Sequence, residues 1–249
     1  MDKVKSRRNT WILAATLALA AAVCVSLAYS DHEFRRRATA ARLRPDGVAA
    51  RPGRIYFASF PKNRLALDVW GWRPEVGHAS VLARDASGRV VMYDYGMFPG
   101  SFNHPNSSGV VGWKGDAWTY GLVVRDDFSV PSGMTDDSRF AAFLLERRSP
   151  VTEDCPKGFY GEVVELWSVD VEDTGVVERF MEQLAADENR DAFCFWRPGG
   201  YKCGNVSRQA FDAARGGAFY HFVDLLWGGF PGADAPSLGT ERTVYSRSR

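Results

Sequence analysis

The chain has 249 residues, of which 45% are hydrophobic and 13% aromatic, enough for one well-filled core rather than two domains of ordinary size. Its formal net charge of +1 conceals an asymmetry, because nine of the 31 basic residues but only three of the 30 acidic residues lie at or before Arg44. The rest carries 22 basic and 27 acidic residues, a net charge of −5. A mildly acidic globular part lacks the basic surface that nucleic-acid binding requires, which excludes nucleic acid as a partner.

The N-terminal segment has the composition of an export signal or a membrane anchor. An uncharged apolar run from Trp11 to Tyr29 follows several basic residues, and roughly twenty helical residues span the hydrocarbon core of a bilayer. Ser26-Leu27-Ala28 has the small-x-small pattern of a signal peptidase site, but the run is longer than in a usual cleaved signal. Residues 1–30 are therefore predicted to be a signal peptide or a membrane anchor. The remainder is expected to be exported, periplasmic or extracellular, either released or anchored to the inner membrane.

The following residues divide into a linker, a domain and a tail. Residues 31–52 are rich in Arg and Ala, contain Pro45 and Pro52, and lack a sustained apolar face, so a juxtamembrane linker is predicted. The domain is placed at residues 53–235. The last residues, 236–249, are polar and are predicted to be a disordered tail.

Strand and helix signals follow one another through the domain. β-Branched and aromatic runs predict strands at 54–60, 65–70, 77–83, 89–95, 118–124 and 160–171, and Asp85-Ala86-Ser87-Gly88 predicts a hairpin turn. Apolar periodicity predicts helices at 136–148, from Asp173 or Thr174 to Leu184, and from Cys203 to Ala214. Residues 98–115 are predicted to be an irregular loop, and residues 219–227 fit a buried helix or strand.

Cys203 stands at the start of a predicted helix, and His78 opens a predicted strand. Only a thiolate attacks as a nucleophile, and both a helix N-terminus and a nearby imidazolium favour the thiolate. We therefore take Cys203 as the candidate nucleophile and His78 as its general base. The backbone N–H groups of Cys203 and Gly204 are candidate donors to an oxyanion.

The hairpin register decides which residue orients the imidazole. A three-residue loop after Asp85 places His78 near Gly96, with Asp94 on the same face as third member of a triad. A four-residue loop would instead place Tyr95 opposite His78, and Tyr93 or Tyr95 would take that role. The Asp94 register is preferred, although His78 as an ordinary core histidine and Asp94 as an ordinary hairpin acid remain the simpler alternatives.

Several motifs resemble one known family when they are taken in order. They are Phe60-Pro61, Gly77-His78-Ala79, Tyr93-Asp94-Tyr95-Gly96-Met97-Phe98, Trp118-Thr119-Tyr120 and Tyr201-Lys202-Cys203. In this order, the motifs resemble those of the N-terminal periplasmic domain family of lacto-N-biosidases. The resemblance implies an α+β fold of the circularly permuted papain-like, NlpC-type kind, with an antiparallel sheet packed against helices. Two departures are Asp94 in place of the family's usual Asn, and Lys202-Cys203-Gly204-Asn205 in place of Asn-Cys-Thr-Thr.

Three cysteines lie beyond the N-terminal segment: Cys155, Cys194 and Cys203. Three is an odd number, so in an oxidising compartment one of them stays free or pairs with another chain. A Cys155–Cys194 disulfide would leave Cys203 free. A Cys194–Cys203 disulfide would make Cys203 structural.

The predicted function is a cysteine peptidase or amidase that acts on peptide, with cell-wall peptide as the expected substrate. Candidate substrate-binding residues are Tyr95, His104, Trp113 and Tyr201. The sequence contains no close histidine pair for zinc, no Gly-x-Ser-x-Gly elbow and no phosphate loop, so neither a metal nor a cofactor is expected. Two alternatives stay open: a non-catalytic envelope binding or assembly module with a structural Cys203, and a membrane-associated acyltransferase.

Overall fold

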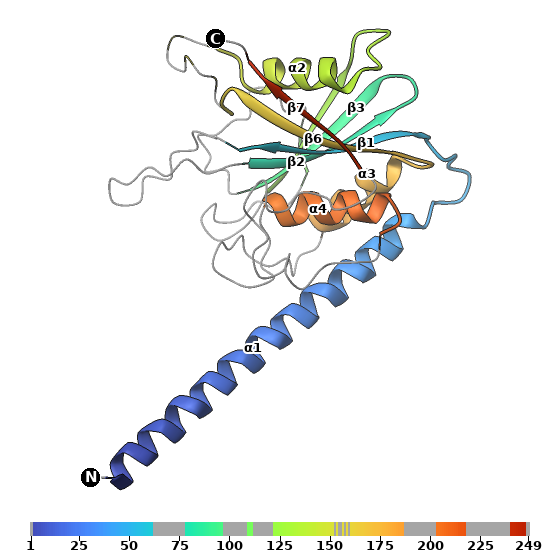
Figure 1. Ribbon diagram of the computed structural model, residues 1–249. Helices are drawn as coiled ribbons and strands as arrows, with labels where there is room; N and C mark the ends of the chain where they lie inside the picture. The colour runs from blue at the N-terminus through green and yellow to red at the C-terminus, as the bar shows by residue number, and fades with distance from the viewer. Residues whose placement is uncertain are drawn as a thin grey trace.

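The computed structural model describes residues 2–61, 78–96, 109–111, 122–186 except 152, 154, 155, 157 and 159, and then 203–217 and 240–247. Their fold is α+β. One antiparallel sheet has the strand order β4-β5-β3-β2-β1-β6-β7. Figure 1 shows α2 on one face of this sheet, with α3, α4 and the end of α1 on the other. The strands are β1 (Gly53–Phe60), β2 (His78–Asp85), β3 (Arg89–Gly96), β4 (Gly109–Val111), β5 (Leu122–Ser129), β6 (Val163–Val171) and β7 (Glu241–Ser246), and the helices are α1 (Asp2–Arg42), α2 (Asp137–Arg148), α3 (Gly175–Ala186) and α4 (Cys203–Ala214).

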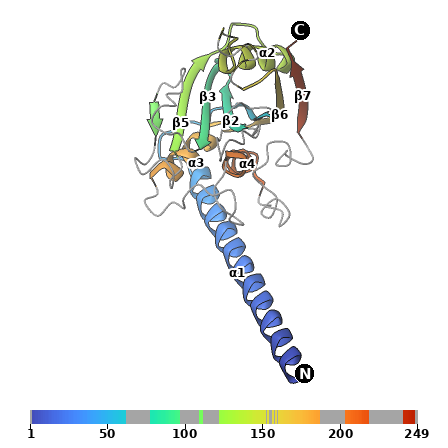
Figure 2. The same ribbon diagram turned by 90° about the vertical axis from the view of Figure 1, so that its left-hand side faces the viewer.

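Alternating side chains along the central strands divide the core into two layers. In β1, Ile55 and Phe57 belong to the cluster shared with α3 and α4, whereas Tyr56 and Phe60 belong to the cluster shared with α2. This is the period-2 pattern of a sheet that is covered on both faces. Figure 2, turned by 90°, shows α3 and α4 beneath the strands and α2 above them.

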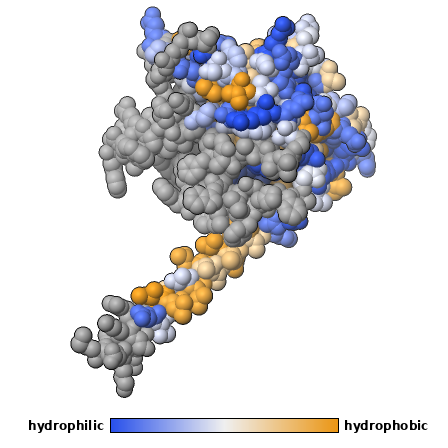
Figure 3. Space-filling model, viewed as in Figure 1, coloured by the Kyte–Doolittle hydropathy of each residue, from blue (hydrophilic) through white to orange (hydrophobic). Residues whose placement is uncertain are grey.

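Helix α1 is one continuous helix of 41 residues. The stretch Asn9–Arg42 is long and apolar enough to cross a membrane by length and composition. Several large apolar side chains in its N-terminal part, among them Trp11 and Leu17, are exposed, and Figure 3 shows this part as an apolar rod that projects from the domain.

The end of α1 is part of the domain, which corrects the linker predicted at residues 31–52. Phe34, Ala38 and Ala41 are buried in the core cluster with α3 and α4. The ring centroid of Phe34 lies 6.2 Å from that of Phe180, and Arg42 Nε donates to the carbonyl of Ala213 at 2.9 Å. The helix is therefore fixed to the domain by packing and hydrogen bonds rather than by an extended tether.

The other element predictions divide into confirmed, corrected and untested ones. The β2–β3 hairpin, α2, α3 and α4 are confirmed, and Asp173 caps α3 by accepting from Gly175 N at 3.1 Å. Two predictions were wrong: β7 pairs with β6 inside the predicted disordered tail, and β4 occupies part of the predicted loop. The predicted elements at residues 65–70 and 219–227 lie outside the described residues.

Candidate active site

The β2–β3 register brings His78 and Asp94 together. Ser80 pairs with Asp94 and Arg84 with Val90, which corresponds to the three-residue loop after Asp85. His78 Nε2 lies 2.7 Å from Asp94 Oδ1, and both side chains are buried. Of the two registers open from the sequence, the structure has the one that brings Asp94 to the imidazole.

Asp94 accepts hydrogen bonds from two further groups. The hydroxyl of Ser80, on the same sheet face, donates to Asp94 Oδ1. The guanidinium of Arg148, at the end of α2, lies 2.5 Å from Asp94 Oδ2. The carboxylate is therefore held in place by three donors.

Tyr160 joins Arg148 to His78. The Arg148 guanidinium donates to the Tyr160 hydroxyl at 3.2 Å and lies 5.0 Å from the centroid of its ring. The same ring is 5.3 Å from the imidazole ring, centroid to centroid. The contacts thus close into a circuit of four residues, which are His78, Asp94, Arg148 and Tyr160. This circuit restricts the orientation of the imidazole.

Cys203 opens α4, and the helix is fixed beside His78. The apolar side chains of Val206, Ala210 and Phe211 bury one face of α4 against the sheet. One turn after Cys203, Ser207 Oγ donates to the carbonyl of Ala79 at 3.2 Å. Because Ala79 directly follows His78, this bond places the N-terminus of α4 next to the imidazole. Cys203 is 6% exposed and has a free thiol.

The imidazole of His78 interacts with both Asp94 and Cys203. Burial lowers the pKa of His78, but hydrogen bonds to Asp94 and Cys203 and the charges of those groups raise it, to about 9 overall. Because Nε2 of His78 is hydrogen-bonded to Asp94, Nδ1 is the ring nitrogen that can interact with the Cys203 sulfur. At neutral pH the ring is therefore an imidazolium between a carboxylate and a sulfur. Burial also raises the pKa of Tyr160 above its usual range, which keeps its hydroxyl neutral.

The structure describes two of the remaining predicted features of the site, the position of Tyr95 and the state of the Cys203 thiol. Tyr95 is fully buried in the core cluster with α3 and α4, so the structure does not place it on a substrate-facing surface. Cys203 is not in a disulfide, in contrast to the alternative with a Cys194–Cys203 bridge. The predicted substrate residues His104, Trp113 and Tyr201, and the predicted disulfide partners Cys155 and Cys194, lie outside the described residues.

Sequence reasoning missed three members of the site: Ser80, Arg148 and Tyr160. Ser80 had a usable signal, because it lies two residues after His78 and so on the same strand face. The sequence places Arg148 at the end of a predicted helix and Tyr160 in a predicted strand. Neither position indicates contact with Asp94 or His78 from sequence alone.

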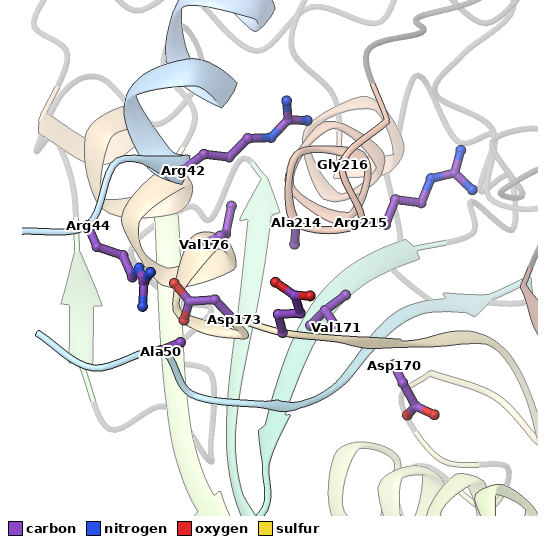
Figure 4. A pocket seen from close by; sticks show the side chains of 11 residues that line it. Arg42, Arg44, Ala50, Asp170, Val171, Asp173, Val176, Ala214, Arg215 and Gly216 are labelled. Carbon is purple, nitrogen blue, oxygen red and sulfur yellow. The ribbon is translucent and has the colours of Figure 1, made fainter.

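A cavity of about 440 Å³ lies away from this site, at the junction of α1, α4 and the turn before α3. Figure 4 shows Arg42, Arg44 and Arg215 around it, together with Asp170 and Asp173. Its lining mixes both charges and contains no residue of the His78 site. Among the described residues, no cluster of three or more His, Cys, Asp or Glu side chains could hold a metal ion.

Comparisons with known proteins do not identify a family. No family model and no curated protein matches the chain, so the resemblance to the lacto-N-biosidase domains rests on the motifs alone. Among solved structures, a type VI secretion system effector, TseH, is similar at 12% sequence identity, over 79% of this chain and 99% of that one, with a TM-score of 0.41. At this level the similarity indicates no function for this chain.

Proposed function

We propose that the protein is a cysteine hydrolase of amide bonds, with Cys203 as nucleophile, His78 as general acid and base, and Asp94 as the group that orients the imidazole. The observation that carries the proposal is the buried imidazole of His78, which lies 2.7 Å from the Asp94 carboxylate and whose pKa is raised by both Asp94 and Cys203, a free cysteine at the start of α4. A nucleophile bonded to a base that a third group orients is the recurring arrangement of covalent acyl transfer.

The first half of the reaction forms an acyl-enzyme. The Cys203 thiolate attacks the carbonyl carbon of the amide, and the developing oxyanion accepts from the N–H groups of Cys203 and Gly204. These groups suit that role because the first N–H groups of a helix have no partner within the helix. The His78 imidazolium gives its proton to the amine, the carbon–nitrogen bond breaks, and a thioester remains on Cys203.

The second half returns the free enzyme. His78, now neutral, takes a proton from water, and the resulting hydroxide attacks the thioester carbonyl. The carbon–sulfur bond breaks, the acid product leaves, and the site returns to thiolate and imidazolium. Asp94 stays ionised throughout and keeps Nε2 protonated, so that Nδ1 exchanges the proton.

For the substrate we propose the peptide part of the bacterial cell wall. The support is α1, whose exposed apolar length suits a signal or an anchor and therefore a domain on the outer side of the membrane. A hydrolase anchored there meets cell-wall peptide within reach of its active site.

The test is hydrolysis of soluble cell-wall peptide fragments by the full chain in detergent micelles, followed by mass spectrometry. We expect new amine and acid termini, and a transient acyl adduct on the Cys203 peptide when the reaction is stopped with acid. Both should disappear in Cys203→Ala, while Cys24→Ala, which changes an exposed free cysteine in α1, serves as the matched control. Hydrolysis that survives Cys203→Ala would exclude the proposed nucleophile.

A further inference from the structure

Arg148 is a cation enclosed in the protein beside the site. Its side chain is fully buried, although a charged group is costly to remove from water unless a partner compensates it. Its guanidinium contacts the carboxylate of Asp94 and the hydroxyl and ring of Tyr160. Of these two partners the carboxylate is the charged one, and Arg148 and Asp94 together form a neutral buried pair.

That pairing changes the charge balance around His78. The imidazolium and the Asp94 carboxylate alone would already be neutral, and a thiolate at Cys203 would then add an uncompensated negative charge. With Arg148 present, Asp94 is balanced by the guanidinium, and among the described residues Cys203 is the other group that raises the pKa of the imidazolium. A thiolate at Cys203 makes the four groups neutral together.

We propose that Arg148 is a positioning residue of the active site: by neutralising Asp94, it makes the Cys203 thiolate the counter-ion of the His78 imidazolium. This inference rests on the proposed function and adds a fourth group to the triad. Arg148 acts through Asp94 and through Tyr160, whose ring lies against the imidazole.

Among the described residues, the other groups around His78 and Asp94 do not supply this positive charge. Ser80, from β2, is a neutral donor to Asp94, and Tyr160, before β6, is a neutral hydroxyl that accepts from Arg148. Burial raises the pKa of Asp126, from β5, and repulsion from the nearby Asp94 carboxylate also raises it. Asp126 has its own cation, because Arg147 lies 2.7 Å from its Oδ1. Two neighbouring arginines of α2 thus balance two buried aspartates, and the charge of Arg148 also lowers the pKa of Asp126.

The test measures how fast iodoacetamide alkylates Cys203 in the full chain between pH 5.5 and 9, by mass spectrometry of the Cys203 peptide. We expect Arg148→Met to slow alkylation at pH 6 by about tenfold or more, since one nearby unit charge is lost from a buried site. Arg148→Lys keeps the charge and should stay within a few-fold of the unmodified chain. The matched control is Arg147→Met combined with Asp126→Asn, which removes the neighbouring ion pair as a neutral unit, and its pH dependence should follow that of the unmodified chain.

A double variant separates charge balance from simple loss of structure. Asp94→Asn combined with Arg148→Met removes both members of the neutral pair, so alkylation at pH 6 should recover toward the rate of the unmodified chain. A merely structural role for Arg148 predicts no such recovery. If Arg148→Met alone does not fold, the proposal is tested with the double variant and with Arg148→Lys. Slow alkylation of Cys203 at pH 6 in either of these two variants overturns the proposal.

The outcomes also separate this inference from the proposed function. If Cys203 in the unmodified chain reacts at pH 6 no faster than it does in denatured protein, the proposed function fails. If the unmodified chain reacts fast and folded Arg148→Met reacts equally fast, the proposed function stands and the role of Arg148 is refuted.

Discussion

The pKa of His78 gives the most detailed prediction. Burial lowers this pKa, but Asp94 and Cys203 raise it from the ordinary 6.5 to about 9. At about 1.4 kcal/mol per pH unit, the difference corresponds to about 3 kcal/mol of folding free energy. Because the folded-state pKa is the higher one, this stabilisation is complete below pH 6.5 and is lost as the pH rises through 9. Replacing the ring by an amide, as in His78→Gln, removes this pH dependence.

Two measurements check the prediction. Carbon-13 NMR of labelled imidazoles follows the four histidines of the chain, and the resonance missing in His78→Gln identifies His78. Its midpoint should lie near pH 9. Urea unfolding in mild detergent should show the free-energy difference between the unmodified chain and His78→Gln shrinking by about 3 kcal/mol between pH 6.5 and pH 10. A midpoint near 6.5, or a difference independent of pH, would refute the arrangement of imidazolium, carboxylate and sulfur.

Three further predictions concern α1, Asp94 and the pH range of activity. Phe34→Ala should lower the free energy of unfolding by about 3–5 kcal/mol, measured by urea denaturation, because Phe34 is buried against Phe180; no change would mean that α1 is only an anchor. Asp94→Asn should move the NMR midpoint of His78 from about 9 toward lower pH, because the carboxylate raises that pKa; an unchanged midpoint would show that Asp94 does not hold the imidazolium. Amide hydrolysis should decrease above about pH 9, where His78 loses the proton that the leaving amine needs, and a pH–rate profile still rising at pH 10 would contradict that role.

The parts of the site that depend on local patterns were predictable from the sequence. Asp85 to Gly88 predicts a short hairpin turn, and once the loop length is chosen, the period of two fixes which residues face His78. The start of α4 at Cys203 also follows from local periodicity. These features bring the imidazole and the carboxylate together without any knowledge of the remaining chain.

The parts that depend on distant contacts were not predictable. Arg148 lies 54 residues after Asp94, and the two meet only because α2 crosses the sheet face that carries Asp94. The buried stripe of Phe34, Ala38 and Ala41 has helical spacing, but the basic run from Arg35 to Arg37 conceals it. A single-sequence pattern shows which side chains are polar, but not which of them a neighbouring element covers.

The edge strand β7 also shows that a contact between distant segments is hard to predict from the sequence. β7 shows only a weak alternation of burial, and its Val244 is about half exposed. Because an edge strand has a neighbour on one side only, its composition need not differ from that of a polar tail. Its pairing with β6 therefore became visible only in the folded sheet.

Alkylation of Cys203 by iodoacetamide at pH 6 tests the central claim most directly. An ordinary cysteine with a pKa of about 8.5 is only about 0.3% thiolate at that pH. The rate, followed by mass spectrometry of the Cys203 peptide, should exceed that of the same cysteine in urea-denatured protein by more than about tenfold, and His78→Ala should remove the excess. A Cys203 that reacts no faster folded than unfolded, or equally fast with and without His78, would contradict the proposed thiolate–imidazolium pair.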